Sequence, residues 1–288
     1  MKKKIFIIAA ILVVVLMSMV SCSAVAKLMS RTNTVNYQIS IDDLEKANVA
    51  EVVASNSVNA CARVIATFRS GMVEETVSGA GFVVTADGYL ITNRHVVVLY
   101  ANHSGTKTSM EKTTECYIPM EPNEIKVAFA DDKVHKATLE DYSNDDDLDL
   151  AIIKIKNEAD VAYQYLQIDQ TSELYYGQSV YTFGNPEGIG ILFCTGNVAS
   201  PSLRMSATSS YESILIDGNI NHGNSGGALL DSNSRVIGVV YARVEGKSSS
   251  SVTYGLGCAI KASDLINYIK SSSVASKVNY SEYKPEEQ

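Results

Sequence analysis

Residues 81–92 are Gly-Phe-Val-Val-Thr-Ala-Asp-Gly-Tyr-Leu-Ile-Thr, two apolar runs on either side of an Asp-Gly pair. Short runs rich in Val, Ile, Phe and Tyr are typical of β-strands. Asp-Gly is the strongest short signal for a tight hairpin turn, because both residues tolerate positive φ. The stretch therefore predicts two antiparallel strands, 81–85 and 89–92, joined at Asp87-Gly88.

The same pattern of short apolar runs between turn residues continues along the chain and predicts an all-β fold. We expect helices only near the two ends. One is predicted over 41–55 from near-helical spacing of apolar residues after a Ser40/Asp43 capping box. The other begins at Ser263, which we expect to be its N-cap. Further strands are predicted at 63–68, 125–129, 135–141, 150–156, 179–183, 191–199, 214–217, 228–231, 236–243 and 255–259.

The first 22 residues have the layout of an export signal: lysines at positions 2–4, an apolar run over 5–20, then Ser21-Cys22-Ser23. Met19-Val-Ser-Cys22 resembles a lipobox, which predicts lipidation at Cys22 and a membrane-anchored lipoprotein. An uncleaved anchor and plain secretion are the alternatives, and all three place the protein outside the cytoplasm. Residues 23–39 are polar and predict a spacer between the anchor and the folded part.

The composition excludes some classes of partner and site. With 46% hydrophobic and 19% charged residues the chain of 288 residues is typical of a globular protein. A net charge of −8 argues against a nucleic-acid partner, which requires clustered Lys and Arg. Beyond Cys22 the cysteines are widely spaced, which predicts no metal site. Their pairing stays open for Cys61 and Cys116, whereas Cys194 and Cys258 lie in apolar runs and are expected to be free thiols.

A serine nucleophile is indicated by Gly223-Asn-Ser-Gly-Gly227. Glycines beside Ser225 would let backbone N–H groups of residues 223–225 (Gly223, Asn224 and Ser225) face one point, as an oxyanion hole requires. A serine also needs a base, and the chain has four histidines. His95 follows a predicted strand, where a site can be built, whereas the other three have no such placement.

The base in turn needs a carboxylate that orients it. Residues 145–147 are acidic and are interpreted as a solvated loop. Asp149 differs, because it abuts the apolar run 150–155 and can be partly buried by it. His95, Asp149 and Ser225 then follow the order of the chymotrypsin triad and not the order of subtilisin or the α/β-hydrolases. Base, oxyanion donors and water suffice for acyl transfer, so no cofactor is expected.

With these residues in place, the chain resembles the HtrA/Deg-type trypsin-like serine proteases. The resemblance rests on segments that run in the family's order from about residue 60 to 270. They are Ser78-Gly-Ala-Gly-Phe-Val-Val, Asp87-Gly-Tyr-Leu-Ile-Thr-Asn-Arg-His-Val-Val, Asp149-Leu-Ala-Ile-Ile-Lys-Ile, Gly184-Asn-Pro-Glu-Gly, Asn221-His-Gly-Asn-Ser-Gly-Gly-Ala-Leu, Val236-Ile-Gly-Val-Val and Gly255-Leu-Gly-Cys-Ala-Ile.

The resemblance implies two six-stranded antiparallel β-barrels with the site in the cleft between them. We expect the N-terminal helix and first barrel in 40–160, the second barrel and C-terminal helix in 161–272, and a frayed polar tail over 273–288. The second barrel should use the residues after Ser225, so we expect no PDZ domain in this chain. Residues 99–124 show no clear strand and, by resemblance, are expected to form a regulatory or contact loop. Trimers, frequent in the family, are a further expectation.

The residue six before the nucleophile is Asn219, where trypsin-like enzymes that select Lys and Arg carry Asp. We therefore expect a substrate pocket lined by Asn219, Ile220, Val240 and Tyr241, which would favour small or aliphatic P1 residues with broad specificity. The predicted function is an exported serine endopeptidase that cleaves proteins, with a role in protein quality control. Two alternatives are a catalytically silent protease fold that binds unfolded polypeptides, and an esterase using the same triad.

Overall fold

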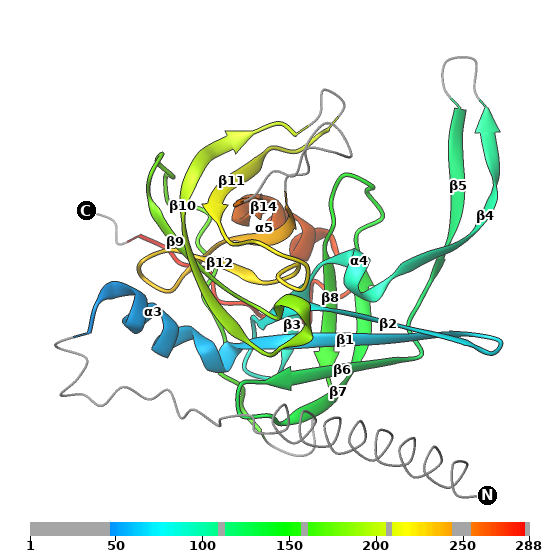
Figure 1. Ribbon diagram of the computed structural model, residues 1–288, viewed down its shortest axis with the longest axis horizontal. Helices are drawn as coiled ribbons and strands as arrows, with labels where there is room; N and C mark the ends of the chain where they lie inside the picture. The colour runs from blue at the N-terminus through cyan, green and yellow to red at the C-terminus, as the bar shows by residue number, and fades with distance from the viewer. Residues whose placement is uncertain (1–46, 109–112, 157–160, 206–208, 244–254, 286–288) are drawn as a thin grey trace, which may run out of the picture. The chain divides into compact units, whose positions relative to one another are not determined.

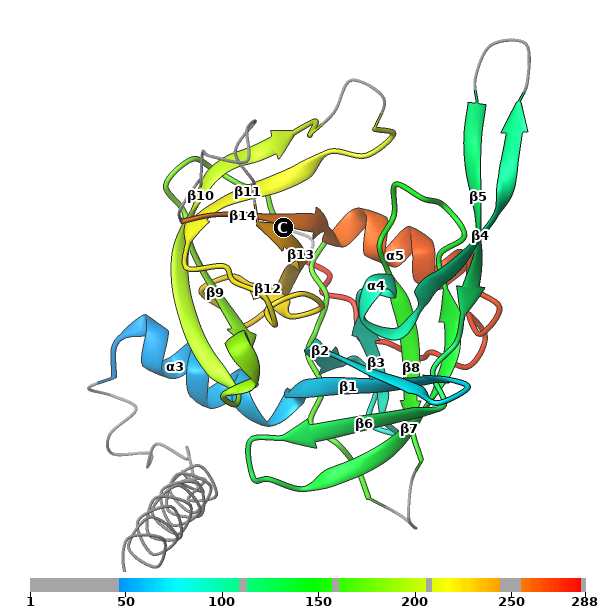
Figure 2. The same ribbon diagram turned by 45° about the vertical axis from the view of Figure 1, so that its right-hand side comes forward.

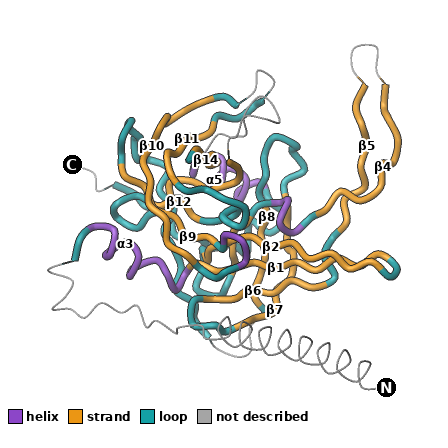
Figure 3. The backbone as a smooth tube through the Cα atoms, viewed as in Figure 1, coloured by secondary structure: helices purple, strands orange, loops and turns teal. Residues whose placement is uncertain are grey.

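The computed structural model describes residues 47–108, 113–156, 161–205, 209–243 and 255–285. The expected export signal, Cys22, the spacer 23–39 and the Ser40/Asp43 capping box lie outside these residues. No helix in the described ranges is long and apolar enough to cross a membrane. The described part is mostly strand, as the orange segments of Figure 3 show.

Two closed six-stranded antiparallel barrels form the body, which confirms the predicted all-β fold (Figure 1). Each barrel closes on itself and therefore leaves no free sheet edge. The first has the strand order β1-β2-β3-β8-β7-β6, with β1 Cys61–Ser70, β2 Val73–Val83, β3 Tyr89–Thr92, β6 Glu124–Phe129, β7 Val134–Tyr142 and β8 Ala151–Ile155. The second has the order β10-β11-β14-β13-β12-β9, with β9 Ser179–Gly184, β10 Leu192–Leu203, β11 Ser213–Gly218, β12 Ala228–Leu230, β13 Val236–Arg243 and β14 Leu256–Lys261.

The hairpin around Asp87-Gly88 forms as predicted. Gly88 adopts φ +93°, which a residue with a side chain rarely adopts, and its N–H donates to the Thr85 carbonyl at 3.0 Å. Phe82 then pairs with Ile91, and both side chains are fully buried. The register places the end of β3, and with it the residues that follow Thr92, at one rim of the first barrel.

Three separate apolar clusters make the core. One fills the first barrel and one fills the second. The third lies between them and includes residues of both barrels together with helices α3 (Val49–Ser57) and α5 (Ala262–Ser271). In α5 the buried residues Leu265, Ile266 and Ile269 recur at helical spacing, and burial of each such side chain contributes about 1.5–3 kcal/mol. The two barrels are thus joined through packed side chains.

Both helix starts differ from the prediction. Residues 47 and 48 are not helical, and α3 begins at Val49 because Asn48 forms a capping box with Glu51. The predicted range 41–55 therefore begins too early, because it includes residues 47 and 48. At the other end, α5 begins at Ala262 with Lys261 at the N-cap and no side-chain cap, so Ser263 is not the cap. Strand β14 runs directly into this helix and fixes its start.

The expectation that 99–124 lacks strands is wrong. Strands β4 (Leu99–Thr108) and β5 (Thr113–Met120) pair with each other antiparallel and form a separate two-stranded sheet. Figures 1 and 2 both show this ribbon projecting away from the barrels. Its sequence is mostly polar and lacks the apolar alternation by which strands are recognised. A short turn of 3₁₀-helix follows α3 at Val58–Ala60, and another lies at Pro186–Gly188.

Residues 273–285 of the expected frayed tail are attached to the body. Val274 and Val278 are buried, and the Tyr283 N–H donates to the Ile168 carbonyl at 2.8 Å. The Arg235 guanidinium stacks 3.4 Å from the centre of the Tyr283 ring. Two apolar residues four apart thus anchor a segment whose average composition is polar.

A buried carboxylate, Asp169, fixes the chain that leads into the second barrel. Its oxygens accept hydrogen bonds from the backbone and hydroxyl groups of Thr171 and Ser172, and Arg235 lies 3.5 Å away. Burial alone would raise the pKa of Asp169, but the hydrogen bonds from Ser172 and Thr171 outweigh it and lower the pKa below its ordinary value.

Candidate active site

His95 lies on a single helical turn that follows a strand of the first barrel. β3 ends at Thr92, and the short helix α4 covers Arg94–Val97. Val96 and Val97 are buried in the first barrel's core and anchor this turn. The His95 side chain points out of the core and is about half exposed, at 49%. The imidazole is therefore held by its neighbours yet open to solvent, as a proton-transfer group must be.

Asp149 meets His95 from the neighbouring strand of the barrel, since β3 pairs with β8 and Thr92 lies opposite Ala151. It lies between buried Leu148 and Leu150, just before β8, and its side chain is 21% exposed. One carboxylate oxygen accepts the His95 backbone N–H at 2.9 Å, and the other lies 2.5 Å from His95 Nδ1. A carboxylate only accepts hydrogen bonds, so this contact places the proton on Nδ1 and leaves Nε2 to act as a base.

Ser225 enters the site from the second barrel on a glycine-rich segment. Gly223 and Gly226 adopt φ +97° and +89°, and a Cβ at Gly226 would lie 2.2 Å from the Ala80 carbonyl oxygen. Only glycine fits this close approach. The Ala80 N–H donates to the Ser225 carbonyl at 2.8 Å, which fastens the nucleophile segment to strand β2 of the first barrel.

The Ser225 hydroxyl itself is turned toward the second barrel. Its Oγ donates to the Tyr241 carbonyl at 3.4 Å, and no hydrogen bond joins Ser225 and His95 among the described residues. The two residues are nevertheless neighbours, because a Cβ added at Gly79 would touch both Val96, at 2.6 Å, and the Ser225 carbonyl oxygen, at 2.9 Å. The structure thus joins His95 to Asp149 and brings Ser225 alongside them.

Two of the three predicted oxyanion donors are free to bind a ligand. In the described part of the chain the N–H groups of Gly223 and Ser225 donate to no acceptor, whereas the Asn224 N–H donates to Asn221 at 3.1 Å. The Asn224 side chain is buried and its amide donates to the Asn219 carbonyl at 3.3 Å. Asn224 therefore shapes the loop, whereas the N–H groups of Gly223 and Ser225 have no acceptor within the described residues.

Of the four residues expected to line one substrate pocket, Asn219 and Tyr241 line two different cavities and the other two are buried. Ile220 and Val240 are 7% and 0% exposed and pack into the second barrel's core. Ile220 is drawn in because Gly257 opposite has no side chain: a Cβ there would lie 2.3 Å from Ile220. Asn219 lines a cavity of about 480 Å³, and Tyr241 lines a separate small cavity beside Asp149.

The cavity beside Asn219 is polar. Its walls come from α3 and from strands β9, β10 and β11, and they include the exposed carboxylate of Asp217. The full lining is Ala50, Ser179, Tyr181, Thr195, Gly196, Asn197, Asp217, Gly218, Asn219 and Gly255. An acidic group therefore lies near Asn219, which inspection of the one position six before Ser225 could not reveal.

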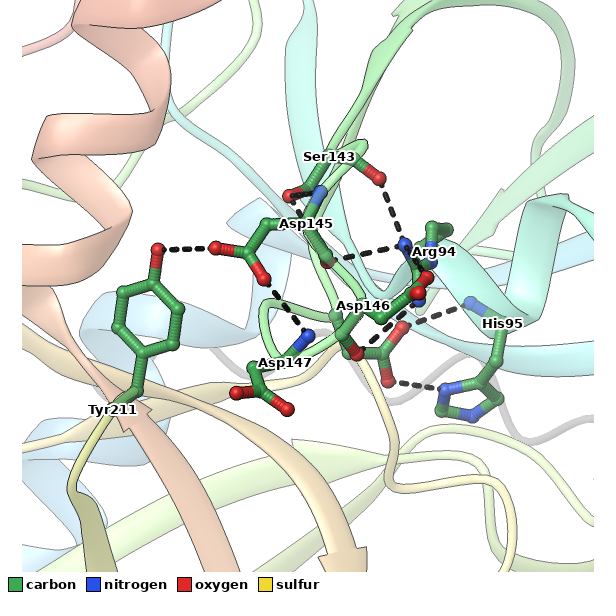
Figure 4. Close-up of polar contacts among 8 residues, drawn as sticks. Arg94, His95, Ser143, Asp145, Asp146, Asp147 and Tyr211 are labelled. Atoms are coloured by element: carbon green, nitrogen blue, oxygen red, sulfur yellow. Dashed lines mark hydrogen bonds and ion pairs between the residues drawn. The ribbon is translucent and has the colours of Figure 1, made fainter. Parts of the chain in front are cut away.

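Figure 4 shows a network around the acidic loop that the sequence reasoning missed. Arg94, adjacent to His95, is buried and donates to backbone carbonyls of residues 143, 145 and 146. On the opposite side of this loop the Tyr211 hydroxyl donates to Asp145 at 2.9 Å. The exposure of residues 145–147 confirms the predicted solvated loop, and hydrogen bonds from both barrels also fix its position. The one available signal was an arginine directly before the histidine.

The free thiols expected at Cys194 and Cys258 are confirmed, and Cys61, whose pairing was left open, is also a free thiol in the described residues. Burial raises the pKa of Cys61 far above its ordinary value and that of Cys258 to about 11. The side chain of Cys116 lies outside the part of the chain that can be described.

Comparison with known proteins agrees with this geometry. A model of the trypsin-like peptidase domain matches residues 79–239. The chain belongs to the trypsin-like peptidase family. Within it, the HtrA-type proteins are its relatives. It is 32% identical over 188 residues to the probable periplasmic serine endoprotease DegP-like of Chlamydia pneumoniae, covering 65% of this chain and 32% of that protein. It is 27% identical over 204 residues to the serine endoprotease DegS of Escherichia coli K12, covering 70% and 50%.

A solved structure of the HtrA-type protease AlgW with a tripeptide superposes with a TM-score of 0.59 at 25% identity. The match covers 78% of this chain and 64% of that one. The chain spans between about a third and a half of the length of the two sequence relatives named above.

Proposed function

We propose that this member of the HtrA-type trypsin-like peptidases is a serine endopeptidase that cleaves proteins. Ser225 would attack the scissile carbonyl, His95 Nε2 would take its proton and return it to the leaving amine, and Asp149 would orient the imidazole. A water molecule then hydrolyses the acyl-enzyme. The observation that carries the proposal is the contact between His95 and Asp149 through both the ring and the backbone, beside a serine on a glycine-rich turn.

The N–H groups of Gly223 and Ser225 support the same chemistry, since neither has an acceptor among the described residues and backbone donors of this kind can stabilise an oxyanion. Loss of one such donor costs about 10²–10³ in kcat in a comparable enzyme. For the reaction to start, the Ser225 hydroxyl must rotate from the Tyr241 carbonyl toward His95. A substrate that competes for the Tyr241 carbonyl would favour this rotation.

For substrate choice we propose broad specificity with small or aliphatic P1 residues. The neutral amide of Asn219 supports this, although the aliphatic residues expected beside it are buried elsewhere. The Asp217 carboxylate in the same cavity as Asn219 gives the opposing prediction. A peptide library profiled with the wild-type protein separates the two, because cleavage dominated by Lys or Arg at P1 would contradict the aliphatic preference.

The place of action we propose is outside the cytoplasm, with the chain membrane-anchored through Cys22 and active in protein quality control. The support is the layout of residues 1–22 and the word periplasmic in the names of the relatives. A trimer is proposed by resemblance to the family. Metabolic labelling with a fatty-acid probe, compared between the wild type and Cys22→Ser, tests the anchor.

One observation favours a second function, a silent protease fold that binds unfolded polypeptides: the Ser225 hydroxyl bonds to Tyr241 and not to His95. Cleavage of casein by the full chain, together with labelling by a fluorophosphonate probe, decides between the two. We expect both activities in the wild type and neither in Ser225→Ala. Casein binding without cleavage or labelling of the wild type would support the silent fold and reject the peptidase.

A further inference from the structure

Three consecutive residues, Asn93, Arg94 and His95, hold the loop 143–149 that ends in the triad carboxylate. The Asn93 amide donates to the Asp149 backbone carbonyl at 2.6 Å, and His95 contacts the Asp149 carboxylate. Between them, the Arg94 side chain passes into the loop. The segment that carries the base and the segment that carries its carboxylate are therefore joined by hydrogen bonds from three successive residues.

Arg94 binds the loop through backbone carbonyls and not through a carboxylate. Its Nη1 donates to the carbonyls of Ser143 and Asp145 at 2.9 and 3.1 Å, and its Nη2 donates to that of Asp146 at 3.4 Å. The Asp146 carboxylate lies 3.6 Å away but is 94% exposed, whereas the Arg94 side chain is only 9% exposed. An exposed ion pair contributes little, so the three carbonyls dominate the contact.

Geometry makes arginine suited to this task. Its planar fork carries five N–H donors in fixed directions, so one side chain can bind several carbonyls of a turn at once. Lysine would supply a single charged centre and could not reproduce the set. The loop also has partners on the other barrel, since the Ser210 N–H donates to the Asp147 carboxylate at 2.9 Å. Arg94 is thus a buried side chain that binds one side of the loop, while the second barrel binds the other side.

We propose that Arg94 is a positioning residue that fixes the Asp149 carboxylate against His95 through the carbonyls of residues 143, 145 and 146. It touches no substrate, and it acts only through Asp149. The inference rests on the proposed peptidase function. Without the fork the loop can shift, and a displacement of about 1 Å at a catalytic group costs about 10²-fold in rate.

The test compares full-length wild type with Arg94→Lys and Arg94→Gln, measuring kcat and KM on labelled casein. We expect kcat to fall about 10- to 100-fold in both variants with KM within about twofold, because the contact orients the base and does not bind substrate. The matched control is Arg235→Lys, since Arg235 contacts Asp169 and Tyr283 and no triad residue. That control should lower thermal stability and leave kcat unchanged. Asp146→Asn should also leave kcat unchanged.

A double-mutant cycle separates positioning from general loss of structure. In the Asp149→Asn background, Arg94→Lys should reduce the fluorophosphonate labelling rate by less than about twofold, because its effect runs through the carboxylate. The inference is overturned if Arg94→Lys reduces the labelling rate as much in the Asp149→Asn background as in the wild type. It is also overturned if kcat is unchanged in the single variant.

A readout that does not need activity is the downfield proton resonance of the His95 Nδ1–H bond to Asp149. It should shift or broaden in Arg94→Lys and stay in Arg235→Lys. An unchanged resonance in Arg94→Lys overturns the inference whatever the activity. Absence of cleavage and labelling in the wild type would reject the proposed peptidase while leaving this resonance as the test of Arg94.

Discussion

Replacement of Gly79 by alanine tests whether the base and the nucleophile are held by one contact. Strand β2 passes between the two segments at this residue. A Cβ there would lie 2.6 Å from Val96 Cγ2 and 2.9 Å from the Ser225 carbonyl oxygen, whereas ordinary contacts begin near 3.4 Å. Either Val96 or the Ser225 carbonyl must therefore move by about 0.5–0.8 Å; Val96 follows His95 in the chain, and the carbonyl belongs to Ser225 itself. We expect a fall of about 10- to 100-fold in kcat from misplacement of this size.

The matched control is Gly81→Ala on the same strand. Its Cβ would meet the Ile91 carbonyl oxygen and Val64, each at 2.9 Å, inside the first barrel and away from Ser225. Both variants should lose about 1–3 kcal/mol of unfolding free energy from overpacking. Only Gly79→Ala should lose fluorophosphonate labelling rate in proportion to kcat. Equal kcat values in the two folded variants, measured at matched fractions of native protein, would refute the reasoning.

Two further predictions concern stability and thiol chemistry. Because the pKa of Asp169 is lowered by folding, its contribution is present above the ordinary aspartate pKa of about 4 and is lost as pH falls through the lowered value. Asp169→Asn should therefore unfold about 2 kcal/mol more easily than wild type in urea at pH 7, with a smaller difference at pH 3; a constant difference would contradict this. Cys61 and Cys258 should resist alkylation by iodoacetamide at pH 8 until the protein is denatured, since burial raises the pKa of both thiols. Peptide mapping by mass spectrometry would show either site labelled in the native protein if the prediction is wrong.

Strand signals were readable where the side chains of a strand are buried. The run Tyr89–Thr92 forms the strand predicted for it, because its four side chains are buried between turns that the sequence marks clearly. The ribbon β4–β5 was missed because its polar sequence has neither an apolar run nor an alternation of apolar and polar residues. The first turn of α3 was misplaced because the Ser40/Asp43 pair offers a competing capping signal eight residues before the Asn48/Glu51 capping box that the structure uses.

For the site, chemistry was easier to predict than environment. The proximity of His95 and Asp149 follows from the order of motifs on a known fold. The burial of Ile220 does not, because it depends on Gly257, a residue far away in the sequence that leaves room for it. Arg94 was missed for a related reason: its partners are backbone carbonyls near residue 145, and every residue has a carbonyl.

These contacts indicate why a site shared between two barrels can keep its geometry. The nucleophile segment is not carried by the second barrel alone, since the Ser225 carbonyl accepts the Ala80 N–H of the first. The acidic segment is not carried by the first barrel alone, since Tyr211 of the second bonds to Asp145. The Ser225 segment and the acidic segment are thus each fixed to both barrels, so a rotation of one barrel against the other would break hydrogen bonds beside the proposed triad. The geometry of the proposed triad therefore depends on the packing between the barrels. Variants that loosen this packing should lose activity before they unfold.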